Sequence, residues 1–175
     1  MDRKLQKKIV LQGKYEDVIK ENDHLYVIHK FDKICVLPYT ISSEGIVDQV
    51  GVIKELNIEQ NKELYTLISG YSNQDDPTTL VGANRLLFEI IGSNVKKADD
   101  WMYLGNLSNI AGGNMVLYSA NITDLDINEA AEAEVAKQAV KFEMVGANKI
   151  VSSDDALFLA AYMRLYNYFY VSSLQ

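Results

Sequence analysis

Apolar and polar residues alternate along this chain with two periods, one typical of strands and the other typical of helices. The strand-like runs are Leu25–Ile28, Lys33–Tyr39, Val47–Leu56, Leu64–Ile68, Trp101–Gly105, Met115–Ile122 and Lys141–Val145. The run Lys33–Tyr39 is almost continuously apolar, which is typical of a strand buried on both faces. Pro38 falls near its end, where a missing N–H donor matters least. The turn residues at 42–45, just before Val47, predict a hairpin.

The first stretch with helical spacing lies between Gly70 and Gly92. Gly70 ends a strand-like run and can adopt the positive φ of a sharp turn. Asp75-Asp76-Pro77 predicts the start of the helix, as an Asx cap followed by a proline in the first turn. Gly92 predicts its end. The residues that would form its core face, three or four apart, are Leu80, Ala83, Leu86, Leu87, Ile90 and Ile91.

The two ends of the chain carry the other notable patterns. Residues 3–8 are basic and precede Ile9-Val10-Leu11, so residues 1–11 predict either an N-terminal arm or a short leading strand. Ser152-Ser153-Asp154-Asp155 predicts the cap of a C-terminal helix within 154–171. This helix is apolar around most of its circumference, so it either closes the core or meets a partner. The side chains that we expect at an interface are Tyr162, Tyr166, Phe169 and Tyr170 on the helix, and Arg3 and Lys4 on the arm.

Between these ends, the alanine- and glutamate-rich segment 128–140 predicts a short or exposed helix. The order of elements is several strands, a helix after a glycine loop, more strands and a terminal helix. This order predicts an α+β sandwich with a mixed sheet. With 175 residues, no repeat and no long linker, we expect a single domain over residues 1–175.

Composition narrows the classes of function. The chain is 48% hydrophobic and 23% charged, as ordinary globular proteins are. Its net charge of −7 argues against a broad nucleic-acid-binding surface. The single Cys35, with His24 and His29, is too small a set for a structural zinc site. No apolar run reaches the length of a membrane span and the N-terminus does not resemble a signal peptide, so an intracellular protein without a membrane partner is expected.

The stretch from Gly70 to Gly92 resembles the signature of the Nudix hydrolases, which reads Gly, five residues, Glu, seven residues, Arg-Glu-aliphatic-any-Glu-Glu-any-Gly. Arg85, Leu87, Glu89 and Gly92 agree with the signature, and Asp76 stands where its first acid belongs, one residue too far from Arg85. The order of elements is also similar to a Nudix domain over most of the chain. The resemblance implies a Nudix-like α/β/α sandwich. The closing segment SSDDALFLAAYMRLYNY resembles the terminal helix of phage-encoded members of this family.

The resemblance also implies a chemistry. Nudix hydrolases cleave a nucleoside diphosphate linked to another group, with Mg²⁺ held by glutamates of the signature helix. Leu86 and Ile90 occupy two of the three glutamate positions, so we expect no Mg²⁺, no other cofactor and an inactive or impaired site. If the protein is active, Glu89 would hold the metal, with Arg85 and Asp76 as the other site residues. Acids that could assist from loops are Asp75, Asp76, Glu55, Asp99 and Asp100.

Three functions follow from these observations. The leading prediction is a catalytically silent Nudix-fold module that assembles with other protein subunits into an oligomer. A phage tail, neck or portal ring would be one setting, which would place the protein in the host cytoplasm or in a virion. The alternative is an active Mg²⁺-dependent hydrolase of a nucleoside diphosphate derivative. A third possibility is a ligand sensor that retains a nucleotide cleft but performs no chemistry.

Overall fold

The computed structural model describes residues 7–21, 24–57, 62–108, 114–127, 141–147, 150 and 155–172. Several predictions fall outside these residues. They are the basic side chains Arg3 and Lys4, the helix at 128–140, and Ser152, Ser153 and Asp154 of the C-terminal cap.

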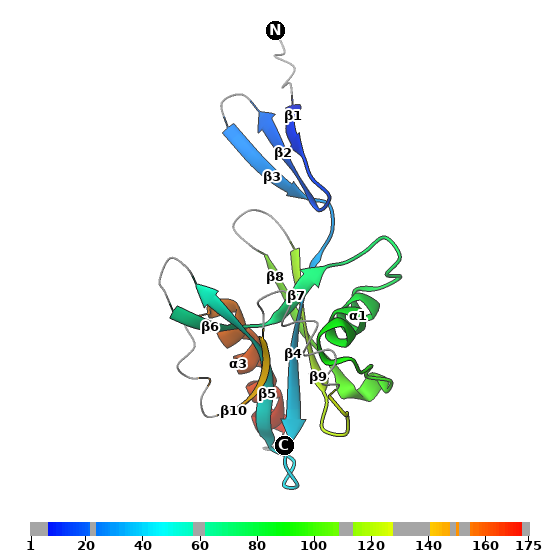
Figure 1. Ribbon diagram of the computed structural model, residues 1–175, viewed down its shortest axis with the longest axis vertical. Helices are drawn as coiled ribbons and strands as arrows, with labels where there is room; N and C mark the ends of the chain where they lie inside the picture. The colour runs from blue at the N-terminus through cyan, green and yellow to red at the C-terminus, as the bar shows by residue number, and fades with distance from the viewer. Residues whose placement is uncertain are drawn as a thin grey trace.

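A mixed sheet of seven strands forms the centre of the molecule (Figure 1). Its strands are β4 (Lys33–Ile41), β5 (Val47–Asn57), β6 (Lys62–Thr66), β7 (Ile68–Tyr71), β8 (Trp101–Ser108), β9 (Asn114–Asn121) and β10 (Lys141–Gly146). The order is β10-β5-β4-β9-β8, with β6 beside β5 and β7 beside β4. The β4–β9 pair is parallel and the other pairs are antiparallel. The predicted mixed sheet is therefore confirmed.

One helix packs on each face of this sheet, α1 (Thr79–Ile91) on one and α3 (Ala156–Ser172) on the other (Figure 1). The central strand β4 serves both layers because its side chains alternate between the faces. Ile34 and Val36 belong to the core under α1, whereas Cys35 and Leu37 belong to the core under α3, and all four are fully buried. A short 3₁₀ helix, η1 (Ala98–Asp100), precedes β8. The predicted α+β sandwich and the doubly buried central strand are confirmed.

The single strand predicted over Leu64–Ile68 is wrong, because the chain changes partners there. β6 pairs with β5 and β7 pairs with β4, and the buried Leu67 separates them. Pro38 lies inside β4 rather than near its end. It is tolerated there because β4 also changes partners, from β7 to β5, at this point. Pro38 falls between Val36, the last residue paired with β7, and Tyr39, the first paired with β5.

Residues 7–21 and 24–29 form a second, smaller sheet that projects from one end of the sandwich (Figure 1). Its antiparallel strands are β1 (Lys7–Gln12), β2 (Glu16–Glu21) and β3 (His24–His29). Of the two alternatives for the start of the chain, the strand is therefore observed from Lys7 onwards. The sheet touches the sandwich through Tyr15, whose ring stacks on Tyr71 at 4.8 Å.

The ends of the helices match the predictions only in part. Gly92 closes α1 in a left-handed conformation with φ of 70°, as predicted. The predicted start at Asp75-Asp76-Pro77 is wrong, because Thr78 is the N-cap and its Oγ1 accepts from Val81 N–H at 3.3 Å. At α3, Asp155 Oδ1 accepts from Phe158 N–H at 2.7 Å, so Asp155 supplies the predicted cap. Within the described ranges, no helix combines the length and apolarity needed to span a bilayer.

Candidate functional site

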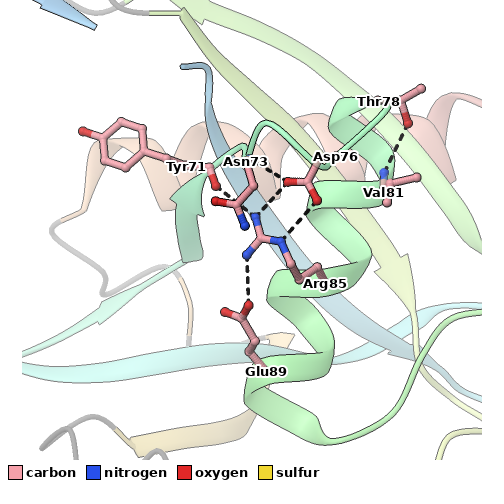
Figure 2. Close-up of polar contacts among 7 residues, drawn as sticks. All are labelled: Tyr71, Asn73, Asp76, Thr78, Val81, Arg85 and Glu89. Carbon is pink, nitrogen blue, oxygen red and sulfur yellow. Dashed lines mark hydrogen bonds and ion pairs between the residues drawn. The ribbon is translucent and has the colours of Figure 1, made fainter. Parts of the chain in front are cut away.

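The loop between β7 and α1 closes around the guanidinium of Arg85, which projects from the second turn of the helix (Figure 2). Its Nε and Nη2 donate to the two carboxylate oxygens of Asp76 at 3.3 and 2.9 Å. Nη2 also donates to the backbone carbonyl of Tyr71 at 3.0 Å, and Nη1 donates to Glu89 Oε1 at 2.9 Å. One cation thus joins the end of β7, the loop and the helix.

Asp76 has a structural role in this loop that the sequence did not reveal. Its side chain is 6% exposed, and its Oδ2 also accepts from Asn73 N–H at 2.8 Å. The hydrogen bonds from Arg85 lower the pKa of the Asp76 carboxyl, and the bond from Asn73 acts in the same direction. The carboxylate is therefore held charged, with both oxygens occupied, and it anchors the loop instead of starting the helix.

Glu89 is the acid of α1 that agrees with the signature. Its side chain is 54% exposed and pairs with Arg85, which lies one helical turn earlier on α1. This contact orients the Glu89 carboxylate along the helix surface and satisfies one of its two oxygens.

The residues at the two other glutamate positions belong to the core. Leu86 is 7% exposed and packs directly over Gly70, where an added Cβ would lie only 2.5 Å from Leu86 Cδ2. Ile90 is partly buried against the core under α1. The helix face next to the glycine turn is therefore apolar at these two positions.

The other candidate acids lie in different surroundings. Asp75 is exposed at the loop, and Asp100 lines a separate cavity of about 260 Å³ together with Lys97 and Asp124. Among the residues that the structure describes, no three or more His, Cys, Asp or Glu side chains are grouped so that they could share a metal ion.

A second feature, here called the aromatic groove, lies along the C-terminal half of α3. It has a volume of about 430 Å³ and lies between α3, the beginning of β5 and the end of β10. Tyr162 and Phe169 line it and also pack on the core, Phe169 against the ring of Tyr39 at 5.5 Å. Tyr166 and Tyr170 are exposed and stack on each other at 3.9 Å. The four aromatics expected at an interface are thus divided between the protein's own core and its surface.

The comparisons with known proteins bear on the fold. No family model matches this sequence, and no curated protein matches it. Its structure is similar to a crystal structure of an ADP compounds hydrolase, with a TM-score of 0.65, 16% sequence identity, and coverage of 96% of this chain and 94% of that chain. The fold is that of a Nudix hydrolase. The expected Nudix-like sandwich is therefore confirmed, whereas the resemblance to phage-encoded members receives no support and stays a prediction.

The contacts around Arg85 also show which site residues the sequence could reveal. The Arg85–Glu89 pair could be predicted because four residues separate them on a helix. The contacts made by the carbonyl of Tyr71 and the N–H of Asn73 could not be predicted, because a backbone group is the same in every residue type. The one available signal for Asp76 was an acid in a loop preceding an arginine on the next helix.

Proposed function

We propose that this chain is a Nudix-fold protein that has lost diphosphate hydrolysis and acts by binding other proteins. The observation that carries the proposal is which residues stand at the metal-binding positions of the Nudix signature. The acids that remain, Asp76 and Glu89, are both bonded to Arg85, and Leu86 packs on Gly70 where the family has a metal-binding glutamate.

The chemistry of Mg²⁺ explains why this arrangement opposes catalysis. Mg²⁺ requires near-octahedral oxygen ligands and gives up its hydration water reluctantly. The site offers it one half-exposed carboxylate, already paired with a cation, beside an aliphatic side chain. A hydrated ion gains little from one such ligand, and the buried Leu86 cannot supply another.

The aromatic groove is the binding surface that we assign to this function. Tyrosine is enriched at protein interfaces because it buries a large ring while its hydroxyl stays solvated. Tyr166 and Tyr170 present stacked, exposed rings beside a groove whose floor includes Leu165, which is fully buried. The partners would be other protein subunits, and a phage tail, neck or portal ring is the assembly that the resemblance of the C-terminal segment implies.

A hydrolysis assay tests the loss of catalysis. ADP-ribose and other nucleoside diphosphate derivatives are incubated with the protein and either Mg²⁺ or Mn²⁺, and release of nucleoside monophosphate is measured. We expect the rate with the natural chain to equal the rate with Glu89→Gln. Turnover by the natural chain that Glu89→Gln abolishes would contradict the proposal.

An association experiment tests the binding role. The tagged chain is used to recover partners from its native lysate or particle, in parallel with a Tyr166→Ser/Tyr170→Ser variant. We expect the natural chain to retain at least one stoichiometric protein partner that the variant loses. Retention of no partner by the natural chain would count against the assembly role.

An active hydrolase is the alternative, and two observations favour it. The overall fold is similar to that of an ADP compounds hydrolase, and Arg85 already orients the Glu89 carboxylate on the helix. The hydrolysis assay distinguishes this alternative from the proposed function, because only an active enzyme depends on Glu89 for turnover.

A further inference from the structure

One wall of the aromatic groove is a row of tyrosines on α3. Tyr162, Tyr166 and Tyr170 follow one another at four-residue spacing, so they lie on the same side of the helix. Their ring centroids are 6.2 Å apart for the first pair and 3.9 Å apart for the second. The rings of Tyr166 and Tyr170 are 36% and 46% exposed. This row, here called the tyrosine ladder, therefore presents aromatic surface to solvent.

The exposed end of the tyrosine ladder is held in one arrangement. The rings of Tyr166 and Tyr170 stack with an interplanar angle of 22°, and their side chains are hydrogen-bonded to each other. Side chains that are ordered before binding lose less conformational entropy when a ligand arrives. The ladder is thus prepared for a ligand that contacts ring surfaces.

The other side of the groove adds a negative charge. Asp48 lies at the beginning of β5 and is exposed, and it is the one charged side chain among the described residues that line the groove. Among the residues that the structure describes, no ion pair involves Asp48. Its carboxylate can therefore accept a cation that comes from outside the chain.

Aromatic ring faces and a carboxylate attract the same kind of ligand, an organic cation. The face of a ring is negative, so a guanidinium or ammonium group above it is attracted. This chain contains one such contact elsewhere, because Lys14 Nζ lies 4.7 Å from the centroid of the Tyr15 ring. Arginine suits the groove better than lysine, because its planar guanidinium stacks on a ring while its N–H groups bond a carboxylate.

The described arginines of this chain are engaged elsewhere. Arg85 is paired with Asp76 and Glu89, and Arg164 Nη1 donates to the carbonyl of Leu104 at 2.8 Å. The chain also has a net charge of −7, which favours the approach of a basic partner. Another protein is therefore the source of the cation that the groove would bind.

We propose that the aromatic groove binds an arginine-bearing basic segment of a partner protein, whose guanidinium stacks on the tyrosine ladder and pairs with Asp48. The volume of about 430 Å³ is sufficient for this side chain and parts of its neighbours. The buried Leu165 and the ring of Phe169 also line the groove and favour apolar neighbours in the segment. The inference rests on the proposed function, because it names the chemistry of the protein that the groove would bind.

The first experiment measures the binding of fluorescent peptides to the full chain by anisotropy. Short peptides with randomised apolar flanks carry a central arginine, lysine or citrulline. We expect saturable binding of arginine peptides, weaker binding of their lysine analogues, and at least about tenfold weaker binding of the citrulline analogues, which keep the planar shape without the charge. Equal binding of arginine and citrulline peptides would overturn the proposal. Free argininamide that binds as tightly as the peptides would also overturn it, because the site would then suit a small molecule.

Variants of the two sides of the groove test the assignment to residues. We expect Asp48→Asn and Tyr166→Ser/Tyr170→Ser each to weaken binding of the best arginine peptide by about tenfold, and Asp48→Asn also to reduce its salt dependence. The matched control is Glu44→Gln, which removes the same charge from an exposed acid in the preceding turn, outside the groove. We expect the control to bind within about twofold of the natural chain. Equal losses in Asp48→Asn and the control would overturn the proposal, because the peptide would then respond only to net charge.

A second measurement uses the natural chain, so it does not depend on the folding of a variant. The best arginine peptide carries a photoreactive group beside its arginine, and the cross-linked chain is digested and sequenced by mass spectrometry. We expect adducts within residues 46–48 and 162–170, which line the groove. Adducts confined to other segments would overturn the proposal.

Recovery of partners from the native lysate separates this inference from the proposed function. We expect a partner that the natural chain retains to be lost by Asp48→Asn as well as by the tyrosine variant. A partner that is lost by Tyr166→Ser/Tyr170→Ser but kept by Asp48→Asn would overturn the basic segment and leave the protein-binding function standing. Recovery of no partner, together with no peptide binding, would overturn both.

Discussion

At the scale of single residues, Arg85 determines the conformation of the loop that precedes α1. Its guanidinium bonds a buried acid, an exposed acid and a backbone carbonyl. These partners contribute unequally to stability, because a charge-assisted hydrogen bond to a buried group stabilises the fold more than one to an exposed group. Asp76 is therefore the partner on which the loop depends, and Glu89 is the partner that the protein can lose with little effect on folding.

Asp76→Asn tests this inequality. Arg85 lowers the pKa of Asp76, so the charged carboxylate stabilises the fold above the unfolded-state pKa of about 3.9, and this contribution disappears as the pH falls through the lower pKa of the folded state. At pH 7 we expect Asp76→Asn to decrease the free energy of unfolding by about 1–2 kcal/mol. The difference from the natural chain should shrink progressively below about pH 4 in urea titrations.

Glu89→Gln is the control for this prediction. It removes an exposed charge from the same arginine, and we expect a change of at most about 0.5 kcal/mol at pH 7. Equal stabilities of Asp76→Asn and the natural chain at neutral pH would show that the loop does not depend on this ion pair.

At the scale of elements, α1 can approach the sheet closely because a buried glycine lies in its first turn. A Cβ added to Gly82 would lie 2.5 Å from Ile34 Cδ1 and 2.9 Å from Asp76 Oδ2. The amphipathic pattern of this helix predicted Ala83, Leu87 and Ile91 in the core, and all three are buried. The pattern could not predict the contact at Gly82, because a residue without a side chain has no hydrophobic signal.

Gly82→Ala tests this close packing. Alanine in a helix interior is favoured over glycine by about 1 kcal/mol. Overpacking of a dense core costs about 1–3 kcal/mol, and both neighbours of the new methyl are constrained, Ile34 by complete burial and Asp76 by Arg85. We therefore expect a net loss of about 1 kcal/mol in the free energy of unfolding from urea titrations, and a gain in stability would show that the contact relaxes freely.

The aromatic side chains of α3 belong to two classes, those that pack on the core and those that are exposed at the surface. Tyr166→Ser/Tyr170→Ser should change the melting temperature little, because both rings are exposed. Phe169→Ala should lower the free energy of unfolding by about 2–3 kcal/mol, because its ring packs on Tyr39 and the core. Differential scanning calorimetry of both variants would separate the two classes, and equal losses would mean that the exposed pair also supports the fold.

At the scale of the whole molecule, the sequence predicted the sandwich better than the sheet that projects from it. The sandwich could be predicted because its buried strands and capped helices have strong patterns, as in β4. The strand β2 was missed because Val18 and Ile19 are flanked by charged residues on both sides, which resembles a loop. Its pairing with β1 and β3 depends on neighbouring strands rather than on its own pattern.

Amide hydrogen exchange can follow the two sheets separately. We expect the amides of β4 and β9 to be the better protected, because these strands are buried within the chain. The amides of β1 and β3 should exchange faster, because most of the side chains of these strands are exposed. Equal protection in the two sheets would contradict this expectation.

The chain contains one cysteine, Cys35, at the centre of β4, where its side chain has no exposed surface. Burial raises the pKa of its thiol to about 11, so the reactive thiolate is scarce at neutral pH. An alkylating reagent can therefore modify this sulfur only when the middle of the sandwich opens. In the natural protein, the rate at which this single sulfur atom is alkylated therefore reports how often the core opens to solvent.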